Sequence, residues 1–218
     1  PGLLAAINAN DALRRRLFRV DFLCASSGEI LVTLVYHKRL DEAWESAARD
    51  LHAEFEVSIV GRSKGQKQVV GYDYVTEQLT VMGKTYHYRQ FEGAFTQPNA
   101  RVNEHMLTWV SAQAAQLSGD LLELYCGNGN FTAVVAQHFE RLLATEISKT
   151  SISALTWALE ANGIDNVAHA RLSAQEVTQA LDKVRPFRRL AHLDLQSYNF
   201  STVLVDPPRA GVDSETLK

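Results

Sequence analysis

The spacing of apolar residues divides the chain into two halves with different rhythms. In the first half, short stretches of alternating or β-branched apolar residues predict strands at residues 18–25, 29–36, 56–61, 67–72, 78–82 and 86–91. Helical spacing of apolar residues predicts two helices, one from Leu4 to Leu17 and one from Asp41 to about Phe55. Turn residues such as Ser26-Ser27-Gly28 separate neighbouring strands. We therefore expect residues 1–94 to form an α+β domain built mostly of antiparallel strands.

From about Pro98 the pattern changes to alternating helices and strands. A helix is predicted to run towards Ser118, and further helices are predicted at residues 130–138, 149–162 and 174–184. Strands are predicted between them, at residues 120–125, 141–146, 166–172 and 202–205. Strands that alternate with helices of this length are typical of a parallel, doubly wound sheet. We therefore expect residues 95–218 to form an α/β domain, with an irregular loop at residues 185–199.

Composition limits the class of protein only broadly. The 218 residues are 46% hydrophobic, so a buried core is expected. The formal net charge is −3, so the overall charge gives no indication that the chain binds nucleic acid. No apolar run approaches the roughly 20 residues of a membrane helix, and the start of the chain shows no signal-peptide pattern. Cys24 and Cys126 are too few for a disulfide framework, so free thiols in a reducing cytosol are expected. The seven histidines show no metal-ligand spacing, and no metal is predicted.

The strongest chemical signal is a strand that runs directly into a glycine turn, between Leu121 and Phe131. Gly127 and Gly129 have no Cβ atom, so the backbone at these positions can approach a ligand closely. Thr132 occupies the position of the third glycine in a dinucleotide-binding fingerprint, which favours a nucleoside ligand without a pyrophosphate. The helix predicted after the turn would direct its N-terminus at a carboxylate of that ligand.

Other polar residues are predicted at the same edge of the sheet. Glu146 ends the second strand, where a carboxylate can accept hydrogen bonds from ribose hydroxyls; for Glu146 alone, a solvated strand end is the competing interpretation. Asp206 ends the last predicted strand, and the two prolines after it hold the following loop rigid. Gln97 and Asn99 offer amide groups to a nucleobase or a methionyl group, although Asn99 can equally cap the next helix.

These elements, in this order, resemble the tRNA (uracil-5-)-methyltransferase family. The resemblance covers nearly the whole chain and is carried by residues 17–44, FTQPN at 95–99, DLLELYCGNGNF at 120–131, ATEIS at 144–148 and VDPPRAGVDSET at 205–216. It implies a Rossmann-like methyltransferase domain preceded by an α+β RNA-binding domain. It also implies S-adenosylmethionine as cofactor, with Gln97, Tyr125, Asn130, Glu146 and Asp206 as its ligands. Gly127 joins this predicted site because the ligand must pass close to its backbone.

The resemblance also implies a reaction. In the family, a Cys thiolate adds to carbon 6 of a uridine in the T-loop of tRNA, carbon 5 takes the methyl group, and a general base then removes the proton. That Cys lies in an S-C-N-P motif after the D-P-P-R segment, and the base lies near the C-terminus; neither is found before Lys218. Cys24 and Cys126 are not credible substitutes. We therefore expect an internal piece of a longer enzyme, inactive alone, with an incomplete parallel sheet and no catalytic residue of its own.

Three alternatives remain at this point. The 23S rRNA uracil-5-methyltransferases share the main motifs, but many members carry a four-cysteine iron–sulfur cluster, which Cys24 and Cys126 cannot form. The exocyclic amino-group methyltransferases have an aromatic residue after D-P-P, where this chain has Arg209. A non-catalytic RNA-binding module is the third possibility.

If the T-arm of tRNA is the partner, a local basic face must bind its phosphates, because the net charge is negative. The candidates are Arg14, Arg15, Arg16, Arg19, Lys64, Lys67, His87, Arg89 and Arg209, with Tyr72, Tyr74 and Tyr86 as aromatic neighbours. A solvated charged surface is the competing interpretation for each of them. We expect the full-length parent to be a cytoplasmic monomer with no membrane segment and no metal.

Overall fold

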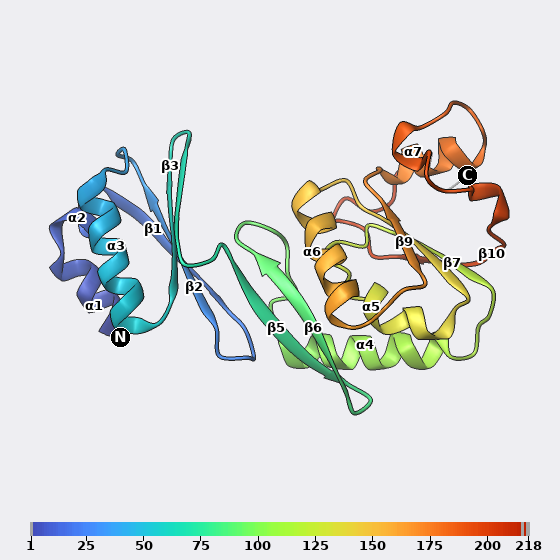
Figure 1. Cartoon of the computed structure of the whole chain (residues 1–218), viewed down its shortest axis with the longest axis horizontal. Coiled ribbons are helices and arrows are strands. Elements are labelled where there is room, and N and C mark those ends of the chain that lie inside the picture. Colours follow the sequence, from blue (N-terminus) through green and yellow to red (C-terminus); the bar gives the residue numbers. More distant parts are fainter. Residues whose placement is uncertain (1, 215, 217–218) are drawn as a thin grey trace. The chain divides into compact units, whose positions relative to one another are not determined.

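A computed structural model describes residues 2–214 and 216 of the chain (Figure 1). The chain forms two compact units. The first contains the chain up to Glu77 together with Gln90–Gly93, and the second contains Gln78–Arg89 together with the chain from Ala94 onward. The hairpin residues 78–89, which precede the boundary predicted after residue 94, thus belong to the second unit.

The first unit is a four-stranded sheet with helices. Its strands are β1 (Leu17–Cys24), β2 (Ile30–Tyr36), β3 (Ser58–Ser63) and β4 (Gln66–Val70), in the order β1-β2-β3-β4. The pairs β1/β2 and β3/β4 are antiparallel, as predicted, whereas β2 and β3 are parallel. The parallel pair exists because helix α3 (Glu42–Phe55) provides the long crossover that two parallel strands need.

The helix predicted from Leu4 to Leu17 is two shorter helices, α1 (Gly2–Ala9) and α2 (Asp11–Arg14). Asn10 separates them because its backbone is extended and its side chain accepts a hydrogen bond from the Ala12 amide at 2.9 Å, which starts the second helix.

Helix α3 packs onto the sheet of the first unit through Trp44, which is fully buried. Asp41 caps the helix by accepting a hydrogen bond from the Trp44 amide at 2.9 Å. On the sheet below, a Cβ atom at Gly61 would lie only 2.4 Å from Cζ2 of Trp44. Glycine at this position in β3 therefore allows the indole ring to lie directly against the strand.

The second unit is an α/β domain with the parallel sheet that the sequence predicted. Its strands are β7 (Asp120–Leu124), β8 (Arg141–Thr145), β9 (Val167–Ala170) and β10 (Phe200–Val205), all parallel and in the order β10-β7-β8-β9. The helices are α4 (Ala100–Ala114), α5 (Thr132–Val135), α6 (Lys149–Ala161) and α7 (Ala174–Leu181), and a short 3-10 turn, Ala136–His138, follows α5. The hairpin of β5 (Tyr74–Val81) and β6 (Lys84–Phe91) precedes α4.

Both faces of the parallel sheet are covered. Leu121 and Leu142 pack towards α5 and α6 on one face, while Leu122 and Leu143 pack towards α7 on the other. Every residue of β7 is buried, as expected for the central strand of a doubly wound sheet. The binding edge of such a sheet is the one at which its strands end.

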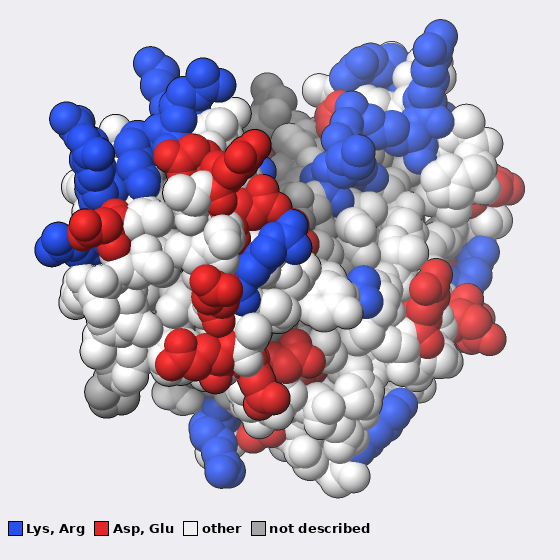
Figure 2. Space-filling model, turned by 60° about the vertical axis from the view of Figure 1, so that its left-hand side comes forward, with Lys and Arg blue, Asp and Glu red and all other residues white. Residues whose placement is uncertain are grey.

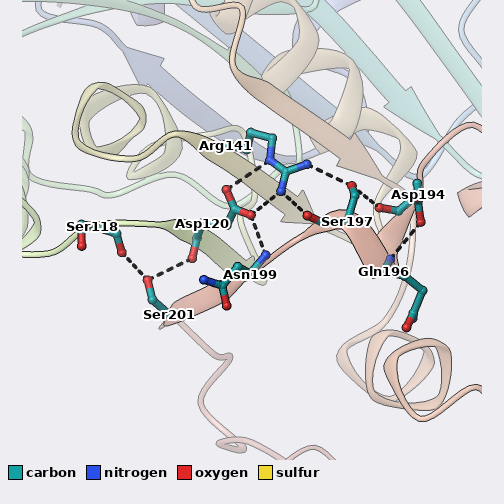
Figure 3. Close-up of polar contacts among 8 residues, drawn as sticks. All are labelled: Ser118, Asp120, Arg141, Asp194, Gln196, Ser197, Asn199 and Ser201. Atoms are coloured by element: carbon teal, nitrogen blue, oxygen red, sulfur yellow. Dashed lines mark hydrogen bonds and ion pairs between the residues drawn. The ribbon is translucent and has the colours of Figure 1, made fainter.

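The opposite edge, where the strands begin, is closed by a polar network (Figure 3). Asp120 at the start of β7 accepts hydrogen bonds from Arg141 at the start of β8 and from the Asn199 amide just before β10. The loop at residues 185–199 contains two 3-10 turns, Arg188–Leu190 and Leu195–Ser197, and Arg141 also bonds to Ser197. In the described part of the chain, no helix is long and apolar enough to span a bilayer.

Candidate functional site

The glycine turn leaves β7 through residues with left-handed backbone conformations. Tyr125, Gly127 and Gly129 have φ angles of 59°, 56° and 86°. A Cβ atom at Gly129 would lie 2.5 Å from Cδ1 of Leu155, so glycine lets α6 approach the turn closely. A Cβ atom at Gly127 would meet nothing within 4 Å. The backbone at Gly127 therefore borders open space in which a ligand can lie.

Glu146 lies beside this turn, as predicted. One oxygen of its carboxylate, Oε2, accepts a hydrogen bond from the Gly127 amide at 3.2 Å, and the other, Oε1, accepts one from the Ser148 amide at 2.7 Å. Glu146 thereby connects the end of β8 to the turn after β7. Each oxygen keeps a second lone pair for another donor, such as a ribose hydroxyl.

Asn130 is held from two sides. Its side-chain amide forms a reciprocal pair with Asn103 of α4, with nitrogen–oxygen distances of 2.8 and 2.9 Å. Its backbone carbonyl accepts a hydrogen bond from the hydroxyl of Tyr88 at 3.1 Å. Sequence analysis did not identify Asn103 or Tyr88, although a buried Asn within an apolar helical stripe is itself a signal that a polar partner lies opposite.

Glu123, in the middle of β7, is a further polar residue that sequence analysis missed. It is only 2% exposed, and its carboxyl group accepts a hydrogen bond from Thr132 Oγ1 at 2.6 Å. Burial, together with a smaller contribution from the negative charge of Asp206, raises the pKa of Glu123 to about 8. Asp206 itself is on the surface, but partial burial of its carboxyl group raises its pKa as well. The two carboxyl groups therefore interact near the end of β7 and β10.

The FTQPN segment leads into α4. Asn99 caps this helix by accepting a hydrogen bond from the Val102 amide at 3.1 Å, which supports the capping interpretation for that residue. Gln97 is half-buried just before the cap, and Phe95 is exposed. Tyr125, which is also a predicted cofactor ligand, is half-buried and packs against the cluster of apolar residues between the sheet and α7.

A groove of about 500 Å³ adjoins Asp206 in the second unit. It is lined by Val102, His105, Met106, Trp109, Val110, Phe131, Leu204, Val205 and Asp206. The lining is largely apolar, with Asp206 and His105 as its ionisable groups. Such a combination suits a flat organic ligand with few polar groups.

Cys126 does not have the surroundings of a nucleophile. Cys126 is buried in the core against α5 and α6, and burial raises the pKa of its thiol well above the usual value. Cys24 is exposed at the end of β1, in the first unit. Among residues 2–214 and 216, no cluster of three or more His, Cys, Asp or Glu side chains could hold a metal ion.

Apart from His87, which is half-buried, the predicted basic residues fall into two groups. Four of them are engaged within their own unit: Arg14 with Asp11, Arg19 with Asp21, Lys67 with Asp73, and Arg89 stacked on Trp157. Arg15, Arg16, Lys64 and Arg209 are exposed, and the described residues offer them no ion pair. In Figure 2, Lys and Arg side chains form separate groups at the upper left and at the upper right of the face drawn, and others lie singly elsewhere on it.

Lys64 belongs to a hollow of about 580 Å³ in the first unit, which we call the basic hollow. It is lined by Tyr36, His37, Lys38, Arg39, Ser63, Lys64, Gly65 and Gln66. Gln66 Oε1 accepts a hydrogen bond from the Leu40 amide at 3.0 Å, and the Ser63 hydroxyl donates to the Lys38 carbonyl, so the two loops around the hollow are tied together. His37, Lys38 and Arg39 could not be predicted from the sequence, because the contact between these loops leaves no signal in local spacing.

Phe18 stands next to the basic hollow. Its side chain is 65% exposed, and its ring meets the ring of His37 edge-on at a centroid distance of 4.7 Å. An exposed aromatic ring beside basic side chains is a common feature of single-stranded nucleic-acid surfaces.

Comparison with known proteins agrees with this arrangement. The family model described as tRNA (Uracil-5-)-methyltransferase matches residues 1–218. A tRNA/tmRNA (uracil-C(5))-methyltransferase of Pseudomonas entomophila is 56% identical over the whole chain, and one of Acinetobacter baylyi is 54% identical. The chain spans 60% and 61% of the length of these curated relatives.

A solved structure shows the same fold at much lower identity. The tRNA (uracil-54, C5)-methyltransferase of Pyrococcus abyssi, in complex with S-adenosyl-L-homocysteine, superposes with a TM-score of 0.70 and 17% identity. The match covers 99% of this chain and 52% of that one. Because the family model covers every residue and the relatives exceed half identity, the chain belongs to the tRNA (uracil-5-)-methyltransferase family.

Proposed function

We propose that this chain provides the cofactor-binding and RNA-recognition part of an enzyme that transfers a methyl group from S-adenosylmethionine to carbon 5 of a uridine in the T-loop of tRNA. The observation that carries the proposal is the hydrogen bond between Glu146 and the Gly127 amide at the edge where β7 and β8 end. It joins a strand-end carboxylate to an open glycine turn, which is the arrangement that a nucleoside needs.

The residues present fit this cofactor. Glu146 is placed to accept hydrogen bonds from ribose hydroxyls, and the open side of Gly127 leaves room for the ligand. Gln97, Tyr125, Asn130 and Asp206 are the remaining proposed contacts, on the strength of the family resemblance. When bound, S-adenosylmethionine supplies an electrophilic methyl group, and the carboxylates of Glu146 and Asp206 favour binding of its cationic sulfonium group.

On the RNA side, we propose that the exposed basic residues bind phosphates of the T-arm. The strongest candidates are Lys64 and Arg39 of the basic hollow, and Arg15 and Arg16, which follow α2 in the sequence. Among the described residues, none of these four side chains forms an ion pair with an acidic residue. Phe18 adds an exposed ring for a base. The names of the relatives, which specify tRNA and tmRNA, favour this substrate over 23S rRNA. We expect the parent enzyme to work as a monomer in the cytoplasm.

The thiolate that attacks carbon 6 is not provided by Cys126, because that side chain is buried and its thiol pKa is raised. We infer that the nucleophile and the general base belong to the part of the relatives' length that this chain does not span. This proposal assigns binding and positioning, and not the covalent step, to the 218 residues.

The test has two arms. Calorimetric titration of the 218-residue chain with S-adenosylmethionine should show binding that Glu146→Gln weakens. Transfer of labelled methyl groups to unmodified tRNA should then occur only with a version extended to the relatives' full length, and Cys126→Ala in that version should remain active. Methylation by the 218-residue chain, or loss of activity in Cys126→Ala with normal folding, would contradict the proposal. Transcripts of 23S rRNA serve as the competing substrate.

A further inference from the structure

The reciprocal pair between Asn103 and Asn130 links helix α4 to the glycine turn. Asn103 is 4% exposed and donates from Nδ2 to Asn130 Oδ1 at 2.8 Å, while Asn130 Nδ2 donates to Asn103 Oδ1 at 2.9 Å. Asn103 is buried and Asn130 is half-buried, and the pairing spares the Asn103 amide the cost of a buried donor and acceptor without partners. The pair therefore has one low-energy geometry, which fixes the position of Asn130 relative to α4.

Two further hydrogen bonds hold the same turn against β6. The Tyr88 hydroxyl, on a side chain that is 1% exposed, donates to the Asn130 carbonyl at 3.1 Å. Asn128 Nδ2 donates to the Arg89 carbonyl at 3.3 Å. The turn that contains Gly127 is thus fixed by contacts from α4 and β6, while the turn itself contains glycines that would otherwise leave it mobile.

Asn103 also couples this turn to the FTQPN segment. It lies in the first turns of α4, the helix that Asn99 caps directly after Gln97. Helix α4 therefore connects the FTQPN segment, which leads into it, to the turn that Asn130 belongs to. Because Asn103 occupies both polar atoms of the Asn130 side chain, that side chain has only one N–H and the remaining oxygen lone pair for a ligand.

We propose that Asn103 is a positioning residue, which holds the Gly127–Asn130 turn in its cofactor-binding shape through Asn130. Its effect on affinity rests on the proposed function, whereas its effect on the turn itself does not. The Asn130 side chain acts mainly as the anchor of the turn. The competing interpretation is a buried polar pair that stabilises α4 without controlling the turn.

The experiment compares three variants of the 218-residue chain by hydrogen exchange of the backbone amides at residues 127–132. Asn103→Leu keeps the size of the side chain and removes both hydrogen bonds. Asn103→Asp keeps one acceptor when ionised, and a protonated carboxyl group restores both bonds. Ser111→Ala is the matched control, because Ser111 is buried on the same helix but bonds to His138 at 2.8 Å, away from the turn.

We expect amide exchange in the turn to be on the order of tenfold faster in Asn103→Leu than in Ser111→Ala. An increase of this size corresponds to the loss of one to two hydrogen bonds. Asn103→Asp should do the same at about pH 7 and return to within about twofold of Ser111→Ala at about pH 5, where a carboxyl group facing an amide oxygen takes up its proton. The Kd for S-adenosylhomocysteine should rise in parallel, roughly tenfold.

Equal exchange in the turn for Asn103→Leu and Ser111→Ala would overturn the proposal, as would an Asn103→Asp variant that does not respond to pH. If Asn103→Leu does not fold, the ratio of exchange in Asn103→Asp to exchange in Ser111→Ala, compared between the two pH values, decides the question. If the unmodified chain binds no S-adenosylhomocysteine while the exchange pattern appears as expected, the proposed cofactor function fails and the positioning role stands.

Discussion

Asp120 and Arg141 form a two-pronged ion pair where β7 and β8 begin, at the edge of the sheet opposite the glycine turn (Figure 3). Arg141 Nη2 lies 2.6 Å from Asp120 Oδ2, and Arg141 Nε lies 3.2 Å from Oδ1. The Asp120 side chain is almost wholly buried, and the Asn199 amide donates to it at 2.7 Å. The guanidinium also stacks on the ring of Tyr198. Through Asn199 and Ser197, this pair holds the loop before β10 against the sheet, so we expect it to contribute to stability.

Arg141→Met should lower the midpoint of urea unfolding, because it removes both guanidinium donors and leaves a buried carboxylate with backbone amides as its donors. Arg141 is the main cause of the lowered pKa of Asp120, so the stabilisation is present above the ordinary pKa of an Asp and is lost as pH falls through the lower folded value. The difference between the two proteins should thus be larger at about pH 6 than at about pH 2.

Arg49→Met is the control for this ion pair. Arg49 pairs with Glu45 on the exposed surface of α3, where an ion pair contributes little. A midpoint that shifts equally in Arg49→Met and Arg141→Met would show that the network in Figure 3 is no more than a surface contact.

Glu123→Gln should change the pH dependence of stability in the sense opposite to Arg141→Met, because the pKa of Glu123 is raised on folding and that of Asp120 is lowered. Burial raises the folded pKa of Glu123 to about 8, above the ordinary value of a Glu, so the folded protein loses stability as pH rises from about 4.5 towards 8. The slope is at most about 1.4 kcal/mol per pH unit. Glutamine stays neutral and still accepts the hydrogen bond from Thr132, so the variant should be the more stable protein at about pH 9.

Urea unfolding at about pH 5, 7 and 9 checks this expectation. Asp206, Cys126 and Tyr88 interact electrostatically with Glu123 and are present in both proteins, so the comparison is made between wild type and variant at each pH. Glu160→Gln, at an exposed position, is the control for removing a surface carboxylate. A wild-type stability that does not fall relative to Glu123→Gln between pH 5 and 9 would refute the buried, protonated state of Glu123.

The sequence predicted the elements of the second unit well because their signals are local. The strand at β7, the glycine turn and the helix after it follow from apolar runs and from Gly127 and Gly129, all within a dozen residues. Glu146 was also placed correctly beside the turn, since strands of a parallel sheet end at one edge.

The missed features depend on contacts between distant parts of the chain. Asn103 and Asn130 are far apart in sequence, and nothing in the spacing of either predicts that their amides meet. Glu123 lies in an apolar strand pattern in which a carboxyl group is unexpected, and its partner Thr132 comes from the next helix. The parallel pairing of β2 and β3 likewise depends on how α3 crosses the sheet, which periodicity does not report.

The two glycines of the turn should respond differently to alanine. Gly129→Ala combines a φ of 86° with a Cβ atom 2.5 Å from Leu155, so a loss of about 2 kcal/mol or more is expected. Gly127→Ala has a φ of 56° and open space, so the loss should be about 1 kcal/mol. Affinity for S-adenosylhomocysteine should nevertheless fall in Gly127→Ala, because the new methyl group occupies the ligand side. Chemical denaturation and calorimetry separate the two effects, and equal stability losses would contradict the role of Leu155.

The proposed binding of RNA phosphates at the basic hollow can be tested by comparing Lys64 with Lys67, a second lysine on the same hairpin. Lys64→Ala should weaken binding of a T-arm RNA and reduce the slope of log K against log salt by about one, because one phosphate contact is lost. Lys67→Ala is the matched control: Lys67 Nζ already lies 2.7 Å from Asp73 and 3.5 Å from Glu92, so its charge is neutralised within the protein. Filter binding across a salt series measures both slopes. A slope that changes in Lys67→Ala and not in Lys64→Ala would place the RNA on another surface, because a lysine without an acidic partner should bind a phosphate more readily than one that already has two.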